Sequence, residues 1–357
     1  MVTPVAFFFM IIAASIAMTS PSAAEFLKET STIEAQVAEA RVARRAVEPM
    51  SRPPERRPNN ERIRGLIPAA DENCLRIDDQ PKTLPQLSLA TAIREIRRSD
   101  IGAWLVRVAV DHGVTLCLDH ATQLQAHYRS HLRLLGLNAK LGPATRVVFL
   151  AHELAHVPQH PRFSNNRRFA PADMLLLQRI REAAAEAVAT RVLWQLRQDG
   201  ATAPWQAKLA TAYHDIAESF EDTMADGRGL ARELWATRSA FHHWFDADWR
   251  LDIYDDLMLE TLARIAEDPI GLIPTSRFLS DRYVRSIADY AGQGFLIGGD
   301  GEALIESFQI RGLPARGRAR LDSILAKARN SLTPTHSSLS GETLSAVSPG
   351  PAALGGN

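Results

Sequence analysis

The feature that most constrains this fold is a run of five apolar residues, 147–151, that leads directly into His152, Glu153 and His156. Such a run predicts a helix buried in a core, where polar side chains are costly unless something satisfies them. Residues four apart share one face of a helix, so both imidazoles can reach the same point. The chain must therefore pack around a buried helix that carries two histidines on one face.

Two histidines at this spacing with a glutamate beside them are typical of the zincin pattern, His-Glu-x-x-His. It predicts His152 and His156 as metal ligands and Glu153 as the general base that takes a proton from a water molecule. The expected cofactor is one Zn²⁺ ion per chain. The alternative is a pair of histidines satisfied by hydrogen bonds in a helical core.

A catalytic zinc site of this kind needs a third protein ligand. Metzincins place glycine and histidine three and six residues after the second histidine, but here Gln159 and Arg162 occupy these positions. A gluzincin instead takes a glutamate from a later helix with small residues around it, and segment 181–187 offers Glu182 and Glu186 around three alanines. The alternative is that both glutamates are solvated charges on a helix surface. Between the two motifs, Pro158 predicts that the helix ends or kinks, because it removes a backbone donor.

On these motifs the chain resembles an uncharacterised bacterial metallopeptidase family, a domain of unknown function of gluzincin type, over roughly residues 66–291. The resemblance implies a zincin-like fold with zinc ligands His152, His156 and Glu182, and Glu153 as the catalytic group. Glu186 would then contact a ligand without binding the ion, or replace Glu182 as the ligand. The chain departs from the family pattern at Ala184, where aspartate is usual, and at Pro158. The residues that carry the resemblance are His152–His156, Gln159, Arg181–Ala185, Trp244, Phe245, Trp249, Arg250, Tyr254 and Asp255.

A third polar and aromatic segment, residues 241–250, offers groups that could stabilise the negative charge of a peptide-cleavage transition state. The candidates there and just beyond it are His243, Arg250 and Tyr254. The alternative is that this segment belongs to the core at a junction between helices.

The periodicity of residues 66–330 predicts an α+β domain that is predominantly α-helical, with a small sheet in its N-terminal half. A short strand is expected at 114–118 and a hairpin within 126–138, with a helix over 123–135 as the alternative to the hairpin. The expected helices span residues 88–98, 102–111, 143–157, 171–197, 204–224, 229–245, 251–267 and 276–290.

The ends of the chain differ from this domain in composition. Residues 1–24 read as a signal peptide with cleavage after Ala24, and the alternative is a membrane anchor at residues 5–19. Residues 25–65 are expected to form a polar helix and a Pro-rich linker, and 331–357 a disordered tail. Either reading of the N-terminus exports the domain, so we expect a periplasmic or secreted protein. Membrane association is expected only if the N-terminal segment stays uncleaved.

An exported chain with only two cysteines predicts a disulfide between Cys74 and Cys117, with two unpaired buried thiols as the alternative. The count excludes a cysteine-rich zinc site.

The 41 basic and 41 acidic residues balance, so no overall field favours nucleic acid as a partner. The leading hypothesis is a zinc metallopeptidase that hydrolyses peptide bonds of proteins or peptides in the cell envelope. Two alternatives remain: a non-catalytic envelope protein with a structural metal or polar site, and a zinc hydrolase of a non-peptide amide.

Overall fold

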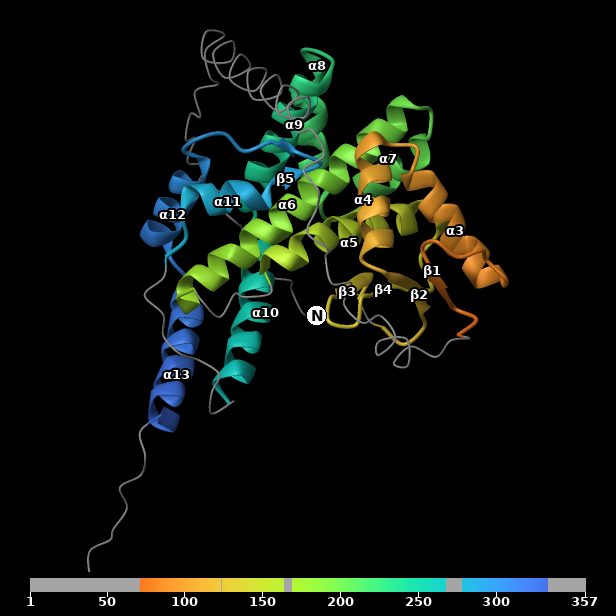
Figure 1. Ribbon diagram of the computed structural model, residues 1–357. Coiled ribbons are helices and arrows are strands. Elements are labelled where there is room, and N and C mark those ends of the chain that lie inside the picture. Colours follow the sequence, from red (N-terminus) through yellow and green to blue (C-terminus); the bar gives the residue numbers. More distant parts are fainter. Residues whose placement is uncertain (1–70, 123, 164–168, 268–277, 333–357) are drawn as a thin grey trace, which may run out of the picture.

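The computed structural model describes residues 71–122, 124–163, 169–267 and 278–332 (Figure 1). The predicted signal peptide, polar helix and linker lie outside the described residues, as does nearly all of the predicted tail. The N-terminal half holds β1 (Cys74–Arg76), α3 (Leu84–Ile96), α4 (Asp100–Asp111), β2 (Thr115–Asp119), β3 (Ala126–Arg129), β4 (Leu134–Asn138) and α5 (Pro143–Phe163). The rest holds α6 (Pro171–Gln198), α7 (Thr202–Leu209), α8 (His214–Ala225), α9 (Leu230–His243), the 3₁₀ helix η2 (Trp244–Asp246), α10 (Asp248–Ala266), α11 (Asp281–Ile287), β5 (Asp289–Tyr290), β6 (Gln293–Gly294), α12 (Asp300–Arg311) and α13 (Ala315–Leu332).

A four-stranded mixed sheet lies in the N-terminal half, in the order β1-β2-β4-β3. Strand β2 pairs antiparallel with β1 and parallel with β4, while β3 and β4 form the predicted hairpin. Cys74 on β1 and Cys117 on β2 are register partners and are joined by the predicted disulfide. The predicted fold class, α+β and predominantly α-helical with a small sheet in this half, is confirmed.

Helices α3 and α4 each begin after a residue whose side chain accepts a hydrogen bond from a backbone N–H group of the first turn. The Thr83 hydroxyl accepts a hydrogen bond from the Gln86 amide at 3.3 Å, and the Ser99 hydroxyl accepts one from the Gly102 amide at 2.8 Å. Such N-caps stabilise a helix by about 1 kcal/mol each. Both helices then bury an apolar face against α5, which fixes α5 between them and the rest of the helical core.

Helices α5 and α6 pack against each other at the centre of the molecule (Figure 1). Ala183, Ala184 and Ala185 on α6 are fully buried, and side chains this small let two helices approach closely. Helix α6 also packs against α7, α9 and α10, so it is buried on several sides. The functional motifs on α5 and α6 therefore lie on the two most central helices.

The sequence predicts that Pro158 ends or kinks helix α5, but the helix does not end there and continues to Phe163. Proline costs one backbone hydrogen bond, but tertiary contacts can outweigh this loss. The next residue, Gln159, is fully buried and donates hydrogen bonds to the Arg181 carbonyl and the Tyr290 hydroxyl, at 3.0 and 2.7 Å. These contacts hold the segment after the proline in place.

Two predicted helices of the C-terminal half have different bounds. The one at 204–224 is split into α7 and α8, because the Thr211 hydroxyl bonds to the backbone at Lys208 and Tyr213 and closes a local turn. The one at 276–290 is limited to α11 and is followed by the short hairpin β5–β6. Ala291 and Gly292, both with positive φ, form the two-residue turn that such hairpins need.

Helices α12 and α13 complete the fold, and α13 packs along α10 on the side of the molecule away from the sheet (Figure 1). None of the helices that the structure describes is long and apolar enough to cross a membrane.

Candidate metal centre

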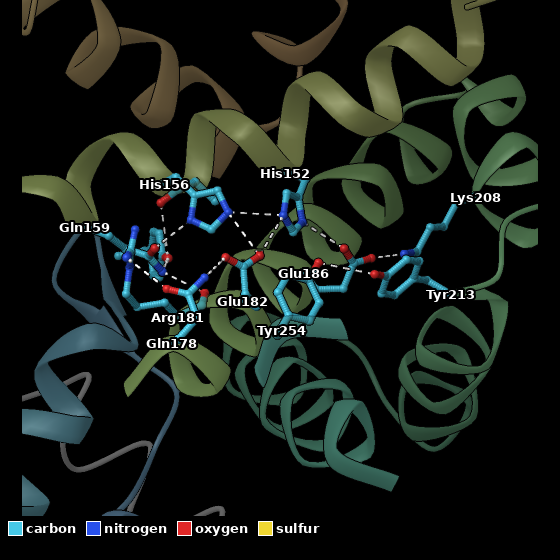
Figure 2. A network of polar contacts seen from close by, with 12 residues as sticks. His152, His156, Gln159, Gln178, Arg181, Glu182, Glu186, Lys208, Tyr213 and Tyr254 are labelled. Atoms are coloured by element: carbon cyan, nitrogen blue, oxygen red, sulfur yellow. Dashed lines mark hydrogen bonds and ion pairs between the residues drawn. The ribbon is translucent and has the colours of Figure 1, made fainter. Parts of the chain in front are cut away.

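Helices α5 and α6 bring three predicted ligands together where they cross (Figure 2). The Nε2 atoms of His152 and His156 are 3.1 Å apart, and Oε2 of Glu182 lies 3.5 and 3.4 Å from them. The three ligand atoms lie within 4.8 Å of one another, a spacing that one metal ion could bridge. Helical spacing accounts for the two histidines, whereas the position of Glu182 depends on the close packing of α6.

The outward nitrogen of each histidine has an acceptor of its own. Nδ1 of His152 lies 2.8 Å from a carboxylate oxygen of Glu186, and Nδ1 of His156 lies 2.8 Å from the amide oxygen of Gln159. The amide of Gln159 cannot be turned round, because its nitrogen donates to the carbonyl of Arg181. Since both partners accept, each Nδ1 carries the proton and each Nε2 presents a lone pair.

In the neutral form of both histidines, the two Nε2 lone pairs converge with a lone pair of Glu182 Oε2. Such a set is repulsive without a cation, so the residues present fit a bound metal ion. Two imidazole nitrogens and a carboxylate oxygen are a donor set that zinc accepts, and three protein ligands leave a fourth position open.

The charge state of Glu182 suits this role. Burial alone would raise the pKa of its carboxyl group, but His156 and His152 outweigh burial and hold that pKa well below its usual range. Its other oxygen, Oε1, accepts a hydrogen bond from the amide of Gln178 at 2.7 Å, which leaves Oε2 directed at the histidines.

Glu153 is buried beside the ligands, with 8% of its surface exposed. Burial raises the pKa of its carboxyl group, while the adjacent His152 and His156 act in the opposite direction and Glu182 reinforces the rise. A buried carboxylate with a raised pKa beside three potential metal ligands is a candidate general base.

Glu186 joins the centre to a residue that the sequence did not indicate. One of its oxygens contacts His152, and the other forms an ion pair with the ammonium group of Lys208 on α7 (Figure 2). Lys208 is 2% exposed. Neither this lysine nor the contact between Gln159 and Tyr290 was predicted, because both depend on segments that only the folded chain brings together.

The three candidate oxyanion stabilisers lie in different places. Tyr254 lies beside Glu182 and Glu186, and burial raises the pKa of its hydroxyl well above the usual value, with the charge of Glu182 adding to the rise (Figure 2). Arg250 is fully buried and makes a bidentate ion pair with Asp215, at 2.9 and 2.7 Å, as well as bonding two carbonyls. His243 pairs with Asp215 and Asp246. The structure thus brings only Tyr254 to the three clustered ligands.

The structure thus combines an α+β, predominantly helical fold with a candidate metal site made of two histidines and one glutamate. A model of the family described as "Putative metallopeptidase family (DUF6782)" matches residues 68–290 of the 357-residue chain, and the chain belongs to this family. No curated protein and no solved structure matches the chain.

Proposed function

We propose that this protein is a zinc-dependent metallopeptidase of gluzincin type. The observation that carries the proposal is the convergence of three metal-ligand atoms, from His152, His156 and Glu182, while the Nδ1 atom of each histidine lies beside an acceptor. Family membership supports the same conclusion. The buried Glu153 favours a catalytic over a structural metal site, because a structural site has no need of a base.

A zinc ion held by these side chains would lower the pKa of a water molecule to about 7 and polarise a substrate carbonyl. Glu153 would accept the proton of the attacking water and transfer it to the leaving amine. Its raised pKa brings the carboxyl group closer to the neutral range in which a general base works best. The hydroxyl of Tyr254, kept protonated by its raised pKa, would donate to the developing oxyanion.

We propose peptides or proteins of the cell envelope as substrates, in the periplasm or outside the cell. The N-terminal sequence supports export, and so does the disulfide, since such bonds persist in oxidising compartments. The balanced charge gives no reason to expect nucleic acid as a partner.

The test is elemental analysis of the gently purified protein together with turnover of a peptide library. The wild type is expected to hold about one zinc per chain and to cleave peptides. Glu153→Gln is expected to keep the metal and to lower kcat by roughly 10²- to 10⁴-fold, because it removes only the base. Purified wild type without a transition metal would contradict the proposal, and so would zinc-loaded wild type without turnover on any peptide or simple amide.

A further inference from the structure

The two glutamates of α6 both reach the metal centre, yet only Glu182 points an oxygen at the two Nε2 atoms. Glu186 lies one helical turn further on, and its two oxygens are divided between His152 and Lys208. The two carboxylates also differ in their second partner. Glu182 accepts a hydrogen bond from the neutral amide of Gln178, whereas Glu186 pairs with the ammonium group of Lys208.

The Lys208 side chain reaches Glu186 from the neighbouring helix α7. This side chain is almost entirely buried, and its ammonium nitrogen lies 5.1 Å from the centre of the Tyr213 ring. A buried ammonium group is costly unless it is paired, and Glu186 provides that pairing. The Tyr213 ring in turn packs edge-to-face against the ring of Trp249.

We propose that Lys208 is a positioning residue that holds Glu186 on His152 and away from the ligand cluster, so that Glu182 completes the metal site. The inference rests on the proposed zinc site. Without the lysine, the oxygen it contacts would be a buried acceptor without a partner, one helical turn from the ligand oxygen of Glu182. Glu186 could then turn toward the ion and release Nδ1 of His152.

The experiment uses the full-length protein and three variants, with zinc affinity measured by chelator competition and coordination read from the visible spectrum of the cobalt(II)-substituted protein. Lys208→Met is expected to weaken zinc binding roughly 10- to 100-fold, the loss that outer contacts of metal ligands typically produce. Its cobalt spectrum should change toward weaker bands, as a further oxygen ligand joins the ion.

The double variant Glu186→Gln/Lys208→Met distinguishes positioning from mere packing. Its amide oxygen can still accept the proton of His152 Nδ1, as Gln159 does for His156, but it competes poorly for the ion. The wild-type cobalt spectrum should therefore return. The matched control is Arg191→Met, which removes a similarly buried cation from α6, where it pairs with Glu233. It should lower the melting temperature of the metal-free protein without changing the spectrum.

Wild-type zinc affinity and an unchanged cobalt spectrum in Lys208→Met would overturn this inference while leaving the zinc site intact. A wild type that binds neither ion would overturn the proposed function itself, and the inference with it. If Lys208→Met does not fold, the test uses the double variant Glu186→Gln/Lys208→Met, which buries no unpaired charge. A cobalt spectrum of this double variant that differs from the wild-type spectrum then overturns the inference.

Discussion

At the scale of single residues, two glutamates of α6 make different contacts in the candidate metal centre. Glu182 presents one oxygen to His152 and His156, whereas Glu186 accepts from the far nitrogen of His152. A carboxylate that binds the ion contributes directly to affinity, while one that orients a ligand contributes through that ligand.

Glu182→Ala is therefore expected to abolish zinc binding at micromolar concentration, and Glu186→Ala to weaken it by about 10- to 100-fold. Chelator competition at constant pH measures both losses, and circular dichroism checks that each variant is folded. Loss of zinc in Glu186→Ala with retention in Glu182→Ala would reverse the ligand assignment, although a site with two histidines and one glutamate would remain.

The sequence predicted the residues whose spacing alone brings them together. His152, Glu153 and His156 lie on one helix, and the alanines after Glu182 indicated where a second helix could approach. Lys208 could not be predicted, since it lies on another helix in a segment without a motif. Its contact with Glu186 depends on the packing of α7 against α6.

At the scale of elements, hydrophobic periodicity predicted the strand β2, the hairpin β3–β4 and most helices. It failed where a local hydrogen bond or turn decides the outcome, as at Thr211, which separates α7 from α8, and at Ala291 and Gly292. It also failed at Pro158, where buried contacts outweigh the cost of a proline inside a helix. Local hydrogen bonding and turn geometry decide the first two places, and tertiary contacts, which a single sequence does not reveal, decide the third.

The disulfide joins β1, a strand of only three residues at the sheet edge, to β2. It spans a sequence separation of 43, for which the chain-entropy model gives roughly 3 to 4 kcal/mol of stability. Replacing Cys74 and Cys117 together by serine should lower the free energy of unfolding by about this amount, measured by urea denaturation. Zinc content should not change, because neither strand carries a ligand; a double variant that loses zinc at full helicity would contradict this.

At the scale of the whole molecule, the family match ends at residue 290, before α12 and α13. The structure nevertheless packs both against the matched region. Arg238 on α9 forms a bidentate ion pair with Asp300 at the start of α12, at 2.8 and 2.7 Å. Arg320 on α13 pairs with Asp256 on α10 at 3.0 Å.

Apolar contacts extend this interface along α13, where Leu321 and Ile324 are buried. Burying a leucine or isoleucine stabilises a fold by roughly 1.5 to 3 kcal/mol, so these two side chains alone contribute several kcal/mol. Helices α12 and α13 therefore pack into the same folded unit as the metal centre.

Ending the chain at residue 298 should consequently lower the free energy of unfolding by several kcal/mol, because it exposes the side of α10 that α13 covers and removes Asp300, with which Arg238 forms an ion pair. Ending it at residue 332 removes only the predicted tail and should change stability by less than about 0.5 kcal/mol. Urea denaturation of the three chain lengths, with zinc content measured on each, makes the comparison. If the chain ending at 298 is as stable as the full-length protein, α12 and α13 are an appendage rather than part of the folded unit around α5 and α6.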